Sequence, residues 1–97
     1  SSSVPQEWRE IFNANGGDMG ETYGVPVEEI VRGIRHGVRK VNIDTDLRLA
    51  MTAEITRIFV ENPAEFDPRK YLGPARDAIK KMVQHKIKNV LGCSNQR

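Results

Sequence analysis

Only one segment of this 97-residue chain, residues 38–43, has the pattern of a β-strand. Its sequence, Val-Arg-Lys-Val-Asn-Ile, places apolar side chains on both faces, which is typical of a parallel strand covered on each side. A lone strand leaves its backbone N–H and C=O groups without partners along both edges. We therefore expect its neighbouring strands to lie outside this sequence. The chain would then be a C-terminal fragment, or one of two polypeptides that form a single domain.

The rest of the chain has the apolar spacing of helices, divided by proline and glycine. The expected elements are a helix from Ser3-Val4-Pro5-Gln6 to about Asn13, a helix from Pro26 to Gly37, a helix from about Asp46 to Glu61, a helical turn from Asp67-Pro68 and, after an interruption at Gly73-Pro74, a final helix to Gly92. Ser3 is the expected N-cap of the first helix, and Asp44 or Thr45 is that of the third.

The segment Asn42-Ile43-Asp44-Thr45-Asp46 follows the predicted strand and opens the third helix. An anion there would meet free N–H groups and the Thr45 hydroxyl, and barrels of alternating strands and helices hold phosphate at such turns. Asn42 can donate and accept hydrogen bonds, which suits a substrate hydroxyl or enolate oxygen. Asp44 and Asp46 carry the wrong charge for this role, so their carboxylates must point away or accept N–H bonds. The alternative is simply a well-capped helix.

Two other segments are candidates for phosphate binding. Ser1, Ser2 and Ser3 precede a predicted helix, where hydroxyls and N–H groups can hold phosphate; a disordered polar N-terminus is the alternative. Arg69 follows the rigid helix start Asp67-Pro68, and a fixed guanidinium suits bidentate phosphate capture. An ordinary surface arginine is the alternative interpretation of this position.

Composition excludes several classes of function. Lys and Arg total 15 against 13 Asp and Glu, and the positive charges are scattered, so no nucleic-acid-binding face is predicted. No apolar run approaches the ~20 residues of a membrane span, and we expect no signal peptide. Cys93 is the only cysteine, which favours a reducing, cytoplasmic location. His36 and His85 have no second ligand at metal-binding spacing, so we expect no metal site in this chain.

Four stretches, SSSVPQEW (residues 1–8), ETYGVPVEEI (21–30), HGVRKVNIDTDLR (36–48) and EFDPRKYL (65–72), stand in the order found in one enzyme family. With them the chain resembles class II fructose-1,6-bisphosphate aldolase from Ser1 to about Val90, and is most similar to the bacterial branch with an extended segment before the last barrel strand. The resemblance implies an α/β fold in which the chain is the C-terminal part of a (β/α)8 barrel. Residues 1–37 would form the loop after strand seven and helices, 38–43 strand eight, 44–61 the phosphate loop and helix eight, and 62–97 a C-terminal helical extension.

The resemblance also implies a reaction and a set of roles. Members of the family reversibly cleave fructose 1,6-bisphosphate to dihydroxyacetone phosphate and glyceraldehyde 3-phosphate, with zinc as a Lewis acid on the ketone oxygen. A monovalent cation near the phosphate loop is a further candidate, and a homodimer or homotetramer is implied. The implied site residues are Ser1 and Ser2 for the ketose phosphate, Asn42 for the enediolate end, Ile43, Asp44 and Thr45 for the rest of the phosphate pocket, and Arg69 for the other phosphate, often across a subunit boundary.

The chain departs from the family in what it lacks. The zinc-binding histidines and acid/base carboxylates of the family are absent, and one of those histidines would stand two residues before Ser1. We therefore expect the zinc ligands in the remainder of the aldolase polypeptide and no aldolase activity from this segment alone. Two alternatives stay open: a tagatose- or other ketose-bisphosphate aldolase, and a non-catalytic helical interaction module, which the isolated strand disfavours.

Overall fold

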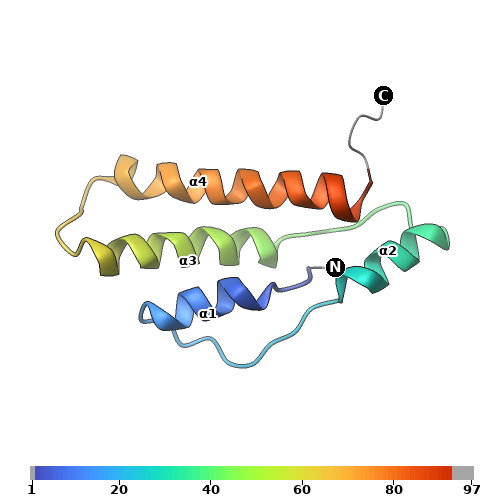
Figure 1. Ribbon diagram of the computed structural model, residues 1–97, viewed down its shortest axis with the longest axis horizontal. Helices are drawn as coiled ribbons and strands as arrows, with labels where there is room; N and C mark the ends of the chain where they lie inside the picture. The colour runs from blue at the N-terminus through green and yellow to red at the C-terminus, as the bar shows by residue number, and fades with distance from the viewer. Residues whose placement is uncertain (1, 93–97) are drawn as a thin grey trace.

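Two long antiparallel helices, α3 (Thr45–Glu61) and α4 (Pro68–His85), dominate the computed structural model, which describes residues 2–92 (Figure 1). Of the nine apolar residues buried within that range, four are alanines at the interface of these helices: Ala50 and Ala53 on α3, and Ala75 and Ala78 on α4. The distance between two packed helices depends on the side chains at their contact. Small side chains on both faces therefore allow α3 and α4 to pack closely.

Three shorter elements complete the chain. Helix α1 (Gln6–Ala14) packs against α3, and α2 (Val27–Arg35) lies near the end where α3 begins (Figure 1). A π-helix, η1 (Lys86–Val90), continues α4 and contacts α2. The start of the chain thus lies beside the start of α3 and the end of α4.

The molecule is a thin layer. Its principal extents are 50 × 33 × 15 Å and its radius of gyration is 15.2 Å, against about 12–13 Å for a compact domain of this length. Several large apolar side chains are consequently exposed, including Phe66 (89%), Tyr23 (72%) and Val60 (53%). A layer of helices normally buries its apolar face against a second layer, and residues 2–92 supply only one. None of the helices in this range is both long and apolar enough to cross a bilayer.

The predicted positions of the first three helices are confirmed. The second helix starts after Pro26 and is followed by Gly37, whose φ of +108° is the left-handed conformation expected of a helix stop. The predicted N-cap at Ser3 is wrong. Pro5 occupies the cap position of α1 without a side-chain hydrogen bond, because Ser3 instead bonds to Asp46.

The predicted interruption at Gly73-Pro74 is also wrong. Helix α4 runs without a break from Pro68 to His85, with Pro74 inside it. Proline removes one intrahelical hydrogen bond and crowds the carbonyl four residues earlier, here that of Lys70. The packing of α4 along α3 outweighs this local cost, because tertiary burial rather than propensity supplies most helical stability in proteins.

Residues 38–43, the predicted strand eight, have no regular secondary structure here. A strand exists only when a neighbour completes its ladder, and no segment among residues 2–92 pairs with it. Val38 is 44% exposed, as expected for an apolar segment without its covering layers. Strand eight remains a prediction for a barrel in which neighbouring strands are present.

Candidate functional site

The polar turn before α3 is open to solvent. Asn42 and Asp44 are exposed, and Ile43 and Thr45 are half-buried. Asp44 stands at the predicted N-cap position, but its side chain makes no capping hydrogen bond. Its carboxylate instead forms an ion pair with Arg48, with 3.2 Å between Oδ2 and Nε. This ion pair offsets part of the negative charge of Asp44 beside the turn.

Arg48 was not foreseen as part of this turn. Its Nη2 donates to the Thr45 hydroxyl oxygen at 3.4 Å, while its Nε faces Asp44. The signal was present in the sequence, since residues three and four apart share one helix face. Arg48 therefore links Thr45, the first residue of α3, to Asp44 directly before it.

Ser2 lies against this turn, although 42 residues separate it from Asp44. The Asp44 N–H donates to the Ser2 hydroxyl oxygen at 3.2 Å. On its other side, the Ser2 carbonyl accepts from the Val25 N–H at 2.9 Å. The structure thus brings one of the two predicted serines to the predicted phosphate turn. Ser1, the other serine, lies outside the described residues.

Gly24 allows the loop before α2 to pack directly against the backbone of Ser2. A Cβ atom added at position 24 would stand 2.0 Å from the Ser2 carbonyl oxygen, a distance that no side chain can occupy. Only glycine allows the loop before α2 to run this close to the N-terminal segment. The geometry of Ser2 is therefore fixed from both sides, by Gly24-Val25 and by Asp44.

A buried ion pair lies directly behind these residues. Asp46 is fully buried, and its Oδ2 accepts from Lys86 Nζ at 2.8 Å. The same oxygen accepts from the Ser3 N–H and the Ser3 hydroxyl, each at 2.9 Å, and Oδ1 accepts from the Val4 N–H at 2.6 Å. Lys86 Nζ also donates to the Ser3 hydroxyl oxygen at 2.8 Å. We call Ser3, Val4, Asp46 and Lys86 the buried network.

The network keeps Asp46 ionised. Burial alone would raise the pKa of its carboxyl, but hydrogen bonds from Lys86, Ser3 and Val4 outweigh burial and hold the pKa below its ordinary value. We expected the Asp46 carboxylate to point away from the turn or to accept N–H bonds. It accepts N–H bonds, and the donors belong to Ser3 and Val4 rather than to α3.

Sequence reasoning missed the network, although one signal could have found it. Asp46 shares a helix face with Leu49, Ala50 and Ala53, all buried, and Lys86 follows buried Met82 by four residues. A charge placed on an apolar stripe is expected to be buried and paired. The sequence could therefore have indicated that Asp46 and Lys86 are each buried and paired, although not with which partner.

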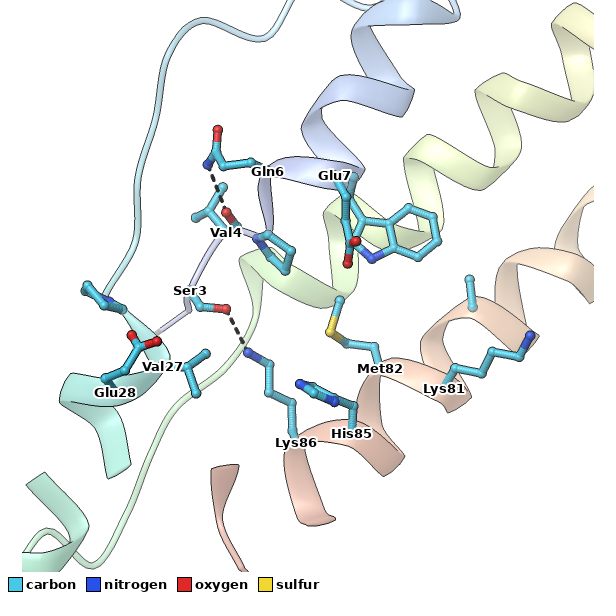
Figure 2. Close-up of a pocket in the computed structure, with 14 residues that line it drawn as sticks. Ser3, Val4, Gln6, Glu7, Val27, Glu28, Lys81, Met82, His85 and Lys86 are labelled. Carbon is cyan, nitrogen blue, oxygen red and sulfur yellow. Dashed lines mark hydrogen bonds between the residues drawn. The ribbon is translucent and has the colours of Figure 1, made fainter. Parts of the chain in front are cut away.

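A hollow of about 500 Å³ lies beside the network. Figure 2 shows Ser3 pointing toward Lys86 on its wall, with Met82, Lys81 and Glu7 around it. Its lining includes none of residues 42–45. The hollow is therefore separate from the polar turn.

Arg69 is not brought to the polar turn. It stands in the first turn of α4, at the opposite end of the helix pair from the first turn of α3 (Figure 1), and the 17 residues of α3 correspond to about 25 Å. Its side chain is 89% exposed and pairs with Asp67, with 2.9 Å between Nη2 and Oδ2. One copy of residues 2–92 cannot place Arg69 and Ser2 on the same phosphate group.

The part of the chain that the structure describes contains no group of three or more His, Cys, Asp or Glu side chains that could hold a metal ion. His36 and His85 are both exposed, and His85 Nδ1 lies 3.0 Å from Asn89 Nδ2. These residues do not fit the zinc site that the family resemblance implies. Residues 2–92 consequently contain no such ligand group for zinc, and the site of a monovalent cation near the phosphate loop stays a prediction.

Comparison with known proteins assigns the family. Residues 18–96 match the family described as fructose-bisphosphate aldolase class-II. A fructose-bisphosphate aldolase of Sinorhizobium medicae is 71% identical over 81% of this chain and 22% of that protein. Fructose-bisphosphate aldolase 2 of Cereibacter sphaeroides is 61% identical over 90% of this chain and 25% of that protein.

A third relative covers nearly the whole chain. The plasmid fructose-bisphosphate aldolase of Cupriavidus necator is 57% identical over 99% of this chain and 28% of that protein. The chain spans between 22% and 28% of the length of these three relatives. Since the family match and these identities extend over most of its residues, the chain belongs to the class II fructose-bisphosphate aldolase family.

Proposed function

We propose that this chain acts as the phosphate-binding C-terminal part of a cytoplasmic class II aldolase that reversibly cleaves fructose 1,6-bisphosphate to dihydroxyacetone phosphate and glyceraldehyde 3-phosphate. One observation carries the proposal. The Ser2 hydroxyl lies 3.2 Å from the Asp44 N–H at the start of α3, so two segments far apart in sequence meet where an anion would bind. The three relatives named above are fructose-bisphosphate aldolases, which supports the same reaction.

The first turn of α3 would hold the ketose phosphate. The leading N–H groups of a helix have no acceptor within the helix and lie at the positive end of its dipole. The Thr45 hydroxyl and the Ser2 hydroxyl can each donate a proton to a phosphate oxygen, the latter while still accepting from Asp44 N–H. Because the Asp44 carboxylate is turned toward Arg48, its charge does not oppose the ligand. Ser1 would bind the same phosphate.

Asn42 would orient the reacting end of the substrate. It is exposed and stands at the start of the polar turn, two residues before Asp44, so its amide can reach an oxygen near the phosphorylated carbon. Such an amide can donate to a developing enediolate oxygen and hold it in place. Together with phosphate binding, this positions the ketose half for bond cleavage by groups elsewhere in the enzyme.

The remainder of the enzyme would complete the fold and supply the metal. Residues 38–43 would pair as strand eight of a (β/α)8 barrel, whose preceding strands would also cover the exposed face of the layer. Zinc, when bound, would polarise the ketone oxygen. Since residues 2–92 contain no ligand group for it, its ligands belong to the rest of the polypeptide in this proposal.

Arg69 would serve the second phosphate from a neighbouring subunit. Its distance from the polar turn along the helix pair excludes a contact with the same phosphate within one chain. Its exposed guanidinium is held by Asp67, which leaves donors free for a phosphate. A homodimer or homotetramer would bring this end of one copy to the site of another.

Replacement of Asn42 in the complete aldolase tests the proposal. Asn42→Ala should lower kcat for fructose 1,6-bisphosphate by about 10²-fold, as for the loss of one donor to a developing oxyanion. Asn15→Ala, at the far end of α1, is the matched control and should retain wild-type kinetics. Wild-type kcat in Asn42→Ala, or no cleavage of fructose 1,6-bisphosphate by the complete wild-type protein, would refute the proposal.

A further inference from the structure

We propose that Asp46 and Lys86 are positioning residues of the phosphate site, and that the C-terminal helix thereby controls phosphate affinity without touching the ligand. This inference rests on the proposed function. Asp46 stands two residues after Asp44, and its partner Ser3 directly follows Ser2. The pair therefore fixes the two segments that meet at the phosphate turn, one on each side.

The network has the properties of a rigid connection. The side chains of Lys86 and Asp46 are 5% and 0% exposed, and their charged atoms are 2.8 Å apart. No buried side-chain polar atom within residues 2–92 lacks a hydrogen-bond partner. Buried polar groups that are fully paired confer a single geometry, whereas partly paired ones are costly. Ser3 bonds to Asp46 and Lys86, which lie 43 and 83 positions further along the chain. This geometry therefore joins both ends of the described chain.

Val4 shows that the network imposes a conformation on the N-terminal segment. Its φ is +51°, a left-handed value that is a rare conformation for a β-branched residue. Such strain persists only where surrounding contacts determine it. Here the contact is the hydrogen bond from the Val4 N–H to Asp46 Oδ1 at 2.6 Å, together with burial of the Val4 side chain. Released from Asp46, residues 2–4 would relax and move the Ser2 hydroxyl.

The pair also balances charge behind the phosphate. Lys86 neutralises Asp46, so the phosphate turn receives no net negative charge from the buried side. Removal of the Lys86 ammonium alone would leave a buried, unpaired carboxylate within two residues of Asp44. Both consequences, a displaced Ser2 and an uncompensated negative charge, act on phosphate binding rather than on bond cleavage.

A comparison of two broken ion pairs on α3 tests this in the complete aldolase. Lys86→Met removes the partner of Asp46. Arg57→Met removes the partner of Glu54, whose carboxylate is 9% exposed and lies on the same helix, eight residues further from the turn. Arg57 is more exposed than Lys86, but the acid left behind is buried in both variants. Steady-state kinetics and amide hydrogen exchange of residues 2–4 and 42–45 are measured for each.

We expect Lys86→Met to raise KM for fructose 1,6-bisphosphate, and the inhibition constant of inorganic phosphate, by about tenfold, with kcat within about threefold of wild type. Amide exchange of Ser3 and Val4 should accelerate at least about tenfold, because Asp46, which accepts from both N–H groups, is no longer held by Lys86. Arg57→Met should change neither measurement. Lys86→Arg, which keeps the charge, should recover part of the phosphate affinity.

Equal changes in KM for Lys86→Met and Arg57→Met, or unchanged exchange of Ser3 and Val4, would overturn the inference while leaving the aldolase reaction in place. The exchange measurement needs no turnover, so it also separates failure of this inference from failure of the proposed function. If Lys86→Met does not fold, Ser3→Ala removes only the hydroxyl that joins Asp46 to Lys86. That variant should raise KM by about threefold, and wild-type KM would again count against the positioning role.

Discussion

The Asp67 carboxylate accepts hydrogen bonds from both the backbone and the side chain of Arg69. Asp67 Oδ1 accepts from the Arg69 backbone N–H at 3.0 Å, which caps α4, and Oδ2 accepts from Arg69 Nη2 at 2.9 Å. These bonds lower the pKa of Asp67 and raise that of Arg69. One carboxylate thus fixes the helix start and restrains the guanidinium that projects from it.

Loss of this carboxylate should affect both stability and substrate binding. Asp67→Ala removes the cap, and we expect a Tm lower by about 2–4 °C in the complete aldolase. It should also raise KM for fructose 1,6-bisphosphate, as we expect of Arg69→Ala, because a mobile Arg69 would bind phosphate more weakly. Asp77→Ala, at an exposed position within α4, is the control. An unchanged Tm in calorimetry of Asp67→Ala would contradict the capping role.

A methyl group at position 24 should displace Ser2. Gly24→Ala would place Cβ 2.0 Å from the Ser2 carbonyl oxygen, so the N-terminal segment must shift away from Asp44. We expect KM for fructose 1,6-bisphosphate to rise by about tenfold or more, a loss of roughly 1.4 kcal/mol of binding. Gly20→Ala is a matched control, since a Cβ there meets no atom within 4 Å. Similar kinetics in the two variants would show that Ser2 does not bind the substrate.

Proline 74 should limit the stability of α4. Pro74→Ala restores an intrahelical donor and removes a clash, and we expect stabilisation by about 1 kcal/mol, less than the ~3 kcal/mol of an isolated helix. Part of the gain is offset because the proline ring, which lines a hollow together with Trp8, is lost. Pro63→Ala, in the exposed connection between α3 and α4, should give no stabilisation. Chemical denaturation of both variants provides the comparison.

Phe59 and Tyr71 should be energetically coupled. Their ring centroids are 4.9 Å apart with an interplanar angle of 60°, a tilted geometry that is favourable for aromatic pairs. A double-mutant cycle with Phe59→Ala and Tyr71→Ala should give a coupling of about 0.5–1.5 kcal/mol. A control cycle with Phe66→Ala and Tyr71→Ala should give a coupling energy near zero, because Phe66 is 89% exposed. Additive effects of Phe59→Ala and Tyr71→Ala would exclude the interaction.

Acid should destabilise the protein through Asp46. Its pKa is lowered in the folded state, so its contribution to stability is present above about pH 4, the unfolded pKa, and is lost as the pH falls through the lower folded value. Asp46→Asn should therefore be less stable at pH 7 and should lose less stability between pH 5 and pH 2. Urea denaturation at several pH values measures both slopes. Parallel slopes would mean that Asp46 titrates alike in the folded and unfolded protein.

The helices could be predicted because their ends are marked locally. Pro26 and Gly37 bracket α2, and α4 starts at the predicted Asp67-Pro68, where Asp67 is the N-cap. The interruption predicted at Pro74 was wrong because local propensity takes no account of the packing of α4 against α3. The strand at residues 38–43 illustrates the opposite limit, since its pattern is visible in the sequence but its formation depends on strands elsewhere.

The site was only partly predictable for a related reason. The polar turn and its helix start are local features, and the structure places Asp44 and Thr45 at the start of α3. The closeness of Ser2 to Asp44 depends on contacts across 42 residues, which the family resemblance implied but no local pattern could show. Asp46 and Lys86 were visible as charges on apolar stripes, yet their pairing requires knowing which helix faces which.

The π turn at the end of α4 accommodates one extra residue before Gly92. Its defining bond runs from the Leu91 N–H to the Lys86 carbonyl oxygen at 2.8 Å, so the turn contains one residue more than an α-helical turn. Each residue of an α-helix advances the chain by about 100°. An extra residue in a continuous α-helix would rotate Gly92 by roughly that angle, whereas the wider π turn takes up the extra residue within one turn. Deleting one residue from positions 87–89 should therefore give an ordinary α-helical turn and leave Gly92 close to its present angle about the axis.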